Sequence, residues 1–111
     1  MYFAGGKWVL GNEGDSCEET CSKTESVCNT NAQSNLTTNE LISKKMLEAG
    51  YECRTFFEPI RYIQAPLADP LNPSGNSNAM HCGAIAVGTE SICDISVTKG
   101  IRRLCYCQKG K

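Results

Sequence analysis

The most regular pattern of apolar and polar positions lies in residues 37–50 and is helical. Thr37 and Glu40 have the spacing of a capping box, in which two side chains satisfy each other's free backbone donors. Gly50 stands where a helix commonly ends in a left-handed residue. Between these signals the apolar residues recur at helical spacing: Leu41, Ile42, Met46 and Ala49. The pattern predicts a helix that begins after Thr37 and ends at Gly50.

A second, shorter helix is predicted nearer the start of the chain. Ser16 and Glu19 repeat the capping-box spacing, and we expect the helix to continue to about residues 23–25. A brief extended piece is expected at residues 27–29. Residues 29–36 are polar and without periodicity, which predicts a loop.

Strand patterns are concentrated in the second half of the chain. Short apolar or alternating stretches occupy residues 7–10, 51–57, 83–88, 92–97 and 101–108. An irregular segment is expected before residue 83, because four prolines interrupt it: Pro59, Pro66, Pro70 and Pro73. Since helical signals come early and strand signals late, the expected fold class is α+β, with two short helices and a small antiparallel sheet. We expect a single domain over residues 1–111, with its core at about residues 8–108.

Composition changes this picture mainly through cysteine. The 111 residues include eight cysteines, close to the usage of disulfide scaffolds, and an even number favours an oxidising compartment. We therefore place the chain in the extracellular space or the lumen of the secretory pathway, with the lumenal side of an organelle membrane complex as the alternative. Asn35 begins an Asn-Leu-Thr triplet, the acceptor pattern for N-glycosylation, which fits this route.

Two cysteine pairs have spacings that match two different secondary structures. Cys17 and Cys21 would share one face of a helix, and Cys105 and Cys107 would share one face of a strand. One helical turn advances about 5.4 Å and two strand residues about 6.6 Å, so two parallel disulfides can join the helix to the strand. We predict the pairs Cys17–Cys105 and Cys21–Cys107. The crossed alternative depends on strand direction, which the spacing leaves open.

The other four cysteines stand singly and allow three pairings. A nested, antiparallel arrangement favours Cys28–Cys93 outside and Cys53–Cys82 inside. In the chain-entropy picture each disulfide contributes about 3–5 kcal/mol. We therefore expect the four disulfides to substitute for a large apolar interior.

The cysteines also form a series of short motifs. These are GDSCEETCSKTESVC at residues 14–28, a spaced Cys53, HC at 81–82, SIC at 91–93 and RRLCYC at 102–107. The series resembles the cysteine-rich C-terminal region of N-acetylglucosaminyltransferase V, the Golgi enzyme that adds a β1,6 branch to N-glycans. It covers about residues 14–107 and is loosest between Cys28 and Cys82, where this chain is longer. The resemblance implies a nested disulfide module, standing alone or excised from a larger protein. It implies no transferase activity, because that family's catalytic domains lie upstream of this region.

The sequence offers little chemistry for catalysis or cofactor binding. His81 is the single histidine, and no serine lies in a nucleophile motif, so we expect no catalytic residue and no enzyme activity. Glu18 and Glu19 are interpreted as favourable charge at a helix start rather than as a glycosidase pair or calcium site. Zinc would need a second knuckle, and the spacing of Cys105 and Cys107 is too tight for one, so we expect no metal and no cofactor.

Charge and hydropathy argue against two further classes of partner. The formal net charge is −1 and the basic residues form only short pairs, so we expect no nucleic-acid binding. Arg102 and Arg103, one such pair, are expected on a solvated face or beside the acidic turn at Glu18. No apolar run reaches the roughly 18–20 residues that span a bilayer, so we expect no membrane insertion.

The segment of residues 56–70 mixes aromatics, arginine and proline, a composition typical of contact surfaces. We predict that it binds another protein or a glycan, with these candidate contact residues: Phe56, Phe57, Arg61, Tyr62 and, far upstream, Trp8. The expected function is a non-catalytic module for protein–protein contact or for assembly of a larger extracellular or membrane-associated complex. The alternatives are a carbohydrate-binding, lectin-like module, with Trp8 or Tyr62 stacking on a sugar, and an accessory domain of a glycosyltransferase.

Overall fold

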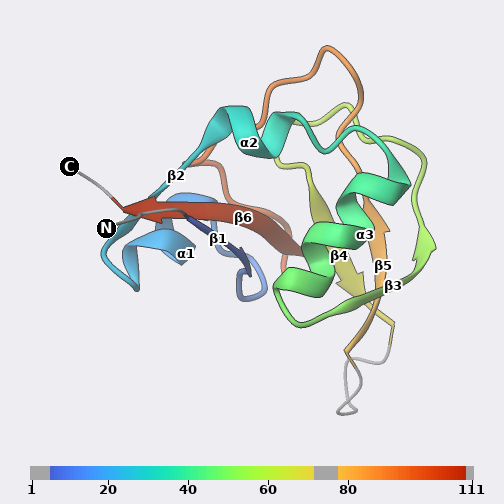
Figure 1. The fold of residues 1–111 in the computed structure, drawn as a ribbon, viewed down its shortest axis with the longest axis horizontal. Coiled ribbons are helices and arrows are strands. Elements are labelled where there is room, and N and C mark those ends of the chain that lie inside the picture. Colours follow the sequence, from blue (N-terminus) through green and yellow to red (C-terminus); the bar gives the residue numbers. More distant parts are fainter. Residues whose placement is uncertain (1–5, 72–77, 110–111) are drawn as a thin grey trace.

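The computed structural model describes residues 6–71 and 78–109, which form three short helices and a mixed β-sheet (Figure 1). In chain order the elements are β1 (Lys7–Leu10), α1 (Cys17–Ser22), β2 (Ser26–Cys28), α2 (Thr30–Ser34), α3 (Asn39–Glu48), β3 (Glu52–Phe56), β4 (Leu67–Pro70), β5 (Ala79–Gly83) and β6 (Arg102–Lys109). The fold class is α+β and disulfide-rich, as the sequence predicted. The expectation of two helices was wrong, because α2 lies in the stretch that was expected to be a loop.

Strand β6 runs through the middle of the molecule and connects its two ends (Figure 1). The strand order is β1-β6-β4-β5-β3, and β2 also pairs with β6. β6 begins beside β4, where Ala68 lies opposite Arg102, and ends between β1 and β2, where Cys107 lies opposite both Lys7 and Cys28. Every strand that contacts β6 runs antiparallel to it.

The sheet is mixed rather than antiparallel, because β3 and β5 are parallel. A parallel pair needs a long crossover connection. Residues 57–66 and β4 supply it, and they carry the chain away from β3 before it returns beside it as β5. The prediction of an antiparallel sheet was therefore wrong at this pair, which depends on contacts far apart in the sequence.

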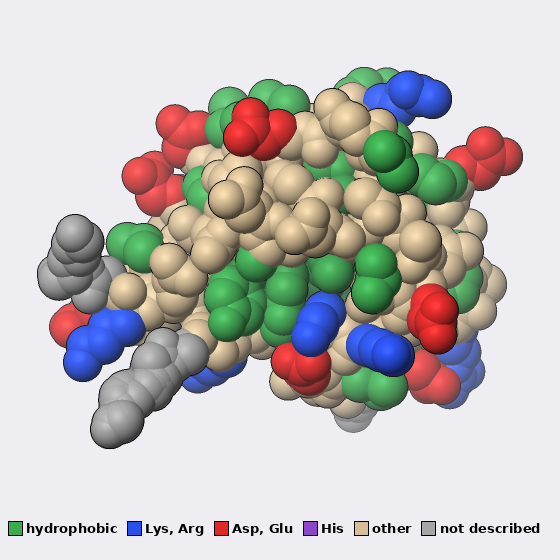
Figure 2. Space-filling view, turned by 45° about the horizontal axis from the view of Figure 1, so that its top comes forward, with side chains coloured by type: hydrophobic (Ala, Val, Ile, Leu, Met, Phe, Trp, Pro, Cys, Tyr) green, Lys and Arg blue, Asp and Glu red, His purple; other side chains and the backbone are tan. Residues whose placement is uncertain are grey.

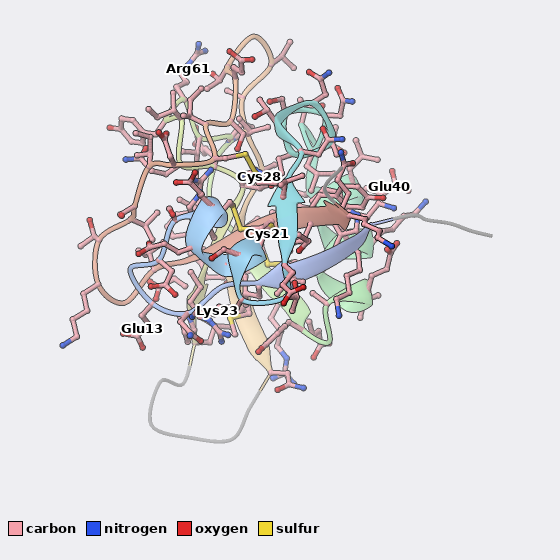
Figure 3. The ribbon with its side chains drawn as sticks, turned by 90° about the vertical axis from the view of Figure 1, so that its left-hand side faces the viewer. Glu13, Cys21, Lys23, Cys28, Glu40 and Arg61 are labelled. Carbon is pink, nitrogen blue, oxygen red and sulfur yellow. A yellow bond between two sulfur atoms is a disulfide. The ribbon has the colours of Figure 1, made fainter. Side chains whose placement is uncertain are left out.

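All four predicted disulfides are present, and the pairing is uncrossed: Cys17–Cys105, Cys21–Cys107, Cys28–Cys93 and Cys53–Cys82. The Cα atoms of the bridged residues lie 5.2–6.0 Å apart, within the usual range. Helix α1 packs on β6, so the first two bridges fix the N-terminal helix to the C-terminal strand (Figure 3). We call these two bridges the clamp.

The helix boundaries confirm one of the two predicted capping boxes. The Ser16 amide donates to Glu19 Oε1 at 2.8 Å and the Glu19 amide donates to Ser16 Oγ at 3.0 Å, so α1 begins where predicted, although it ends at Ser22. Helix α3 is capped by Thr38, one residue later than expected, and Gly50 follows it with a φ of 95°. Only glycine adopts that backbone angle without strain.

Helix α2 and two strands show where the pattern was misleading. The side chain of Asn29 caps α2 by accepting from the Ala32 amide at 3.0 Å, a signal hidden in a polar stretch. Strands β4 and β5 occupy residues assigned to the proline-rich loop, whereas the strands predicted at residues 83–88 and 92–97 are absent. Within residues 83–88, only Ile85 forms an isolated β-bridge, and its partner is Ile60. Pro73 lies outside the described residues.

Two neighbouring clusters contain most of the buried apolar side chains. The larger is apolar and lies between α3 and the sheet; it contains Trp8, Leu10, Leu36, Ile42, Met46, Ala68, Met80, Cys82, Ala84 and Leu104. The smaller consists of the four cysteines of the clamp. The molecule therefore has an apolar core as well as a sulfur cluster, and β6 contributes to both.

Candidate functional site

The loop of residues 57–66 leaves β3 and is fixed to the body of the molecule along its length. The Phe57 amide donates to the Cys82 carbonyl at 2.9 Å, and the Ile60 amide donates to the Ala84 carbonyl at 2.8 Å. Ile60 in turn accepts from the Ala86 amide at 2.8 Å. These bonds hold the first half of the loop against the chain that continues from β5, in the manner of a strand but without strand regularity.

The second half of the loop is held by residues on its other side. The Ile63 carbonyl accepts from the Ile92 amide at 2.9 Å, and the Pro66 carbonyl accepts from the Leu104 amide at 3.0 Å. Loops with few fixed backbone groups are usually the mobile parts of a protein. This one is pinned between two other segments, so its exposed side chains start from a defined backbone.

A buried arginine on β6 organises the segments behind the loop. Arg103 is fully buried, and its Nη1 donates to the carbonyls of Ile92 at 2.6 Å and Ile95 at 2.7 Å. Its Nη2 donates to Ser91 Oγ at 3.0 Å and to the Ile63 carbonyl at 3.3 Å. The guanidinium therefore fixes residues 91–95 and the 57–66 loop to the same strand.

The charge of this arginine persists at neutral pH despite its burial. Burial lowers the pKa of Arg103 to about 10, and the nearby negative charge of Asp94 partly offsets the shift. The expectation that Arg103 is solvated or pairs with Glu18 was wrong. Arg103 lies two and four positions before Cys105 and Cys107 on β6, so it shares their buried face, and that spacing was the signal that could have placed it.

A buried glutamine extends the same network to helix α2. Gln33 has no exposed surface; its Nε2 donates to Ser91 Oγ at 2.9 Å, and its Oε1 accepts from the Tyr106 amide at 2.9 Å. A buried amide with both ends bonded fixes its neighbours more strictly than an apolar side chain does. Ser91 thus connects the glutamine to Arg103. Neither Gln33 nor Ser91 was given a role from the sequence.

The fixed loop presents exposed side chains at its centre. Arg61 is exposed, Tyr62 is 70% exposed and Ile63 is 40% exposed. Val87, 80% exposed, directly follows the Ala86 that bonds to the loop, and it adds apolar surface beside it. On the face shown in Figure 2, both basic and acidic side chains lie around exposed hydrophobic ones. The electrostatic potential of this face is therefore of mixed sign.

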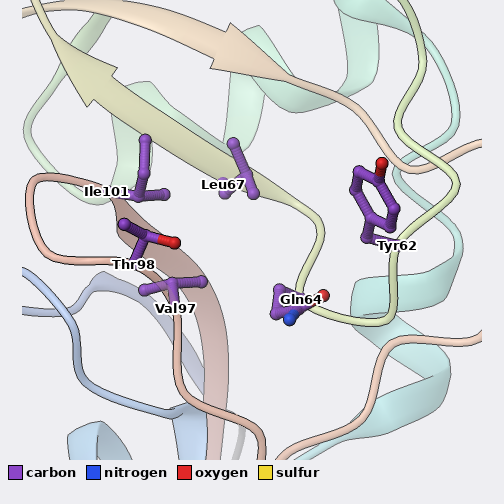
Figure 4. A pocket seen from close by; sticks show the side chains of 6 residues that line it. All are labelled: Tyr62, Gln64, Leu67, Val97, Thr98 and Ile101. Atoms are coloured by element: carbon purple, nitrogen blue, oxygen red, sulfur yellow. The ribbon is translucent and has the colours of Figure 1, made fainter.

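A shallow hollow of about 270 Å³ opens next to Tyr62. Figure 4 shows Tyr62 on one side of it and the 97–101 segment on the other, and the six lining residues are Tyr62, Gln64, Leu67, Val97, Thr98 and Ile101. None of the six is charged. The hollow therefore suits a neutral group with an apolar face, and Gln64 and Thr98 offer it polar atoms.

The structure brings only part of the predicted contact set together. Phe56 is the last residue of β3 and packs on the apolar core, and the half-buried Phe57 has its ring centroid 3.8 Å from that of His81. Trp8 is 7% exposed and packs against Tyr106 with ring centroids 4.9 Å apart. The prediction that Trp8 could stack on a sugar was wrong, because its ring belongs to the core.

His81 lies in a row of polar residues across three strands. Its register partners are Asp69 on β4 and Thr55 on β3, and Thr55 Oγ1 lies 2.5 Å from His81 Nδ1. Nothing in the apolar pattern placed these residues side by side, because the parallel pairing was not expected. In this row Thr55 is exposed, and Asp69 and His81 are half-buried.

Residues 6–71 and 78–109 contain neither a candidate metal cluster nor a helix that could span a membrane. In that part of the chain no three side chains of His, Cys, Asp or Glu gather to hold a metal ion. None of the helices there is long and apolar enough to span a membrane.

No protein-family model matches the sequence, and no curated protein matches it either.

Proposed function

We propose that this chain is a non-catalytic, disulfide-stapled module of the extracellular space or secretory lumen that binds another protein through the 57–66 loop. The observation that carries the proposal is Tyr62: its side chain is 70% exposed, although backbone hydrogen bonds at Ile60 and Ile63 fix the chain on both sides of it. An aromatic side chain held out on a fixed backbone loses little conformational freedom when it is buried by a partner.

The residues around Tyr62 have the chemistry of a contact surface. Tyrosine and arginine are enriched among the residues that dominate binding energies, and Arg61 stands directly beside Tyr62. Ile63 and Val87 add apolar surface to the same region. A partner with a hydrophobic pocket and an acidic rim would match this arrangement.

The compartment is supported by the disulfides and by one surface residue. Four disulfides fit an oxidising environment, because thiols in the cytosol are kept reduced. Asn35 is exposed at the end of α2, so the glycosylation triplet is accessible. The resemblance of the cysteine motifs to a Golgi transferase module points to the same route.

Carbohydrate binding is the second candidate, and the hollow beside Tyr62 is the observation that favours it. Sugars present an apolar face that stacks on aromatic rings and hydroxyls that bond to amides and hydroxyls. Tyr62 would supply the ring, and Gln64 and Thr98 would supply the hydrogen bonds. The uncharged lining favours a neutral sugar over an acidic one.

One set of variants separates these functions. The oxidised chain would be screened against arrays of secreted and cell-surface proteins and of glycans, with Tyr62→Ala, Gln64→Ala and Leu47→Ala in parallel. Leu47 is the matched control, because it is 65% exposed but lies on α3. Protein binding lost only in Tyr62→Ala supports the first function, and glycan binding lost in Tyr62→Ala and Gln64→Ala supports the second. A specific binder that Tyr62→Ala leaves unaffected would refute the role of the loop.

A further inference from the structure

One of the four disulfides differs from the others in its exposure. The sulfur cluster of the clamp is fully enclosed: Cys17, Cys21 and Cys105 have no exposed surface and Cys107 has 3%. Cys82 is also fully buried, and its partner Cys53 packs against the apolar core. Only in the bridge Cys28–Cys93 are both residues partly exposed.

This bridge also forms part of the wall of a surface hollow. The hollow has a volume of about 350 Å³, and its lining residues are Glu18, Ser22, Ser26, Val27, Cys28 and Cys93. Figure 3 faces the side of the molecule on which Cys28 lies, above α1. Thiol–disulfide exchange requires that an attacking thiol reaches a sulfur of the bridge. At Cys28–Cys93 an external thiol can do so without local unfolding of the chain.

The clamp shortens the loop that this bridge closes. Cys28 follows Cys21 by seven positions, and Cys93 precedes Cys107 by fourteen. Because Cys21 and Cys107 are already joined, Cys28–Cys93 closes a small ring within an existing one. Cys53–Cys82 spans 29 residues that no other bridge shortens. Breaking Cys28–Cys93 thus releases less chain entropy than breaking Cys53–Cys82, whereas the two bridges of the clamp, which close a still smaller ring with each other, are shielded by burial.

Hydrogen bonds hold both ends of the bridge independently of the sulfur atoms. On one side, the Cys93 carbonyl accepts from the Glu18 amide at 2.8 Å, and the Ser91 amide donates to Ser34 Oγ at 2.9 Å. Arg103 bonds to the carbonyls on both sides of Cys93, at Ile92 and Ile95. On the other side, Cys28 ends β2, which is paired with β6. These contacts do not need the disulfide.

We propose that Cys28–Cys93 is a thiol–disulfide exchange site, at which a dithiol reduces this one bridge in the folded protein. In the first step a thiolate of the dithiol bonds to Cys28 Sγ, the bond between the two protein sulfurs breaks, and its electron pair leaves on Cys93 Sγ, which then takes a proton from water. In the second step the other thiolate of the reagent attacks the reagent sulfur that is bonded to Cys28 Sγ. The two reagent sulfurs become bonded to each other, and Cys28 leaves as a thiolate. The protein gains two electrons and the dithiol becomes a disulfide.

The direction of attack follows from a neighbouring hydroxyl. Thr30 Oγ1 lies 3.5 Å from Cys93 Sγ, so its hydroxyl can donate to the thiolate as it forms. A sulfur whose negative charge is stabilised is the better leaving group, which makes Cys93 the leaving atom and Cys28 the attacked atom. The carboxylate of Glu18 on the same hollow repels negative charge. A dithiol whose only charge is the attacking thiolate should therefore react faster than a dithiol that also carries carboxylates.

The test is graded reduction of the whole oxidised chain with dithiothreitol at constant pH, quenched with N-ethylmaleimide and mapped by mass spectrometry. We expect label on Cys28 and Cys93 at reagent concentrations that leave the other six cysteines bridged, with the far-ultraviolet circular dichroism unchanged. Label on Cys53 and Cys82 first, or on all eight cysteines in one cooperative step, would overturn the proposal.

Two variants sharpen the result. Thr30→Val keeps the shape of the side chain but removes the hydroxyl, and we expect exchange to slow about threefold or more; an unchanged rate would overturn the assignment of Cys93 as leaving atom. The double variant Cys28→Ser with Cys93→Ser should retain three disulfides and a cooperative thermal transition. Its failure to form the clamp would show that the bridge is needed for folding and would contradict the proposal.

Discussion

The Nη1 atom of Arg103, a side chain with no exposed surface, lies 2.6 Å from the backbone carbonyl oxygen of Ile92. This contact ties an irregular segment to the central strand through a side chain instead of a strand ladder. The same guanidinium also reaches Ile63, beside the exposed Tyr62. The proposed contact loop therefore depends on a residue that no partner would touch.

Removing the guanidinium should destabilise the whole protein. Arg103→Met removes the side-chain donor to the carbonyls of Ile92 and Ile95, and each part-buried group left unsatisfied costs about 1–3 kcal/mol. We expect a loss of about 3 kcal/mol or more in the free energy of unfolding by urea. Arg102→Met is the control; Arg102 is partly exposed and donates to the Gly11 carbonyl, and its loss should cost about 1 kcal/mol. A larger effect at Arg102 would contradict the assigned role.

The contribution of Arg103 should not depend on pH in the physiological range. Its pKa of about 10 in the folded protein is below that of an arginine in the unfolded chain, so both states hold the proton at neutral pH. Above about pH 10 only the unfolded state keeps it, so the contribution of this group to stability rises with pH there. The difference in unfolding free energy between wild type and Arg103→Met should be constant from about pH 6 to about pH 9, and a slope in that range would refute the assignment.

Two aromatic substitutions should differ widely in how much they reduce stability. Trp8→Ala removes a ring from the apolar core and should cost about 3–5 kcal/mol. Tyr62→Ala removes a side chain that is mostly in solvent and should change the free energy of unfolding by less than about 0.5 kcal/mol. Thermal melts of both variants measure this contrast. A Tyr62→Ala variant as unstable as Trp8→Ala would mean that the tyrosine has a structural role.

Asn35 should carry a glycan when the chain passes through a secretory pathway. The asparagine is exposed at the end of α2, while Leu36 between it and Thr37 is 3% exposed and anchors the turn. We expect a mass increase that peptide N-glycosidase F removes. Thr37→Val deletes the hydroxyl that the acceptor triplet requires and should abolish the modification. A secreted protein of unmodified mass would refute this prediction.

The sequence was informative where local spacing decides the structure. The two cysteine spacings predicted the clamp, since a helix and a strand each repeat with a fixed rise, and Ser16 with Glu19 predicted the start of α1. It was misleading where distant segments decide. The parallel pairing of β3 with β5 brings Thr55 beside His81, and the buried Arg103 replaces strand pairing at residues 92–95. Neither is visible in the apolar pattern.

The candidate contact set was predicted in part for the same reason. Composition pointed to the segment that contains Arg61 and Tyr62, and both are exposed there. Composition cannot tell an aromatic residue that faces solvent from one that faces the core, so Trp8 was placed on the wrong side. Its position opposite Tyr106 in the pairing of β1 with β6 decides its burial, and that register needs the whole fold.

The central place of β6 has a consequence for biosynthesis. A chain synthesised only as far as residue 101 contains β1, β2, β4 and α1, yet each of them still lacks β6 or the cysteines with which it pairs. Oxidation at that stage can join Cys17 and Cys21 only to wrong partners. The native sulfur connections therefore require either that oxidation waits until residues 102–109 have been made or that early bridges are reshuffled by thiol–disulfide exchange.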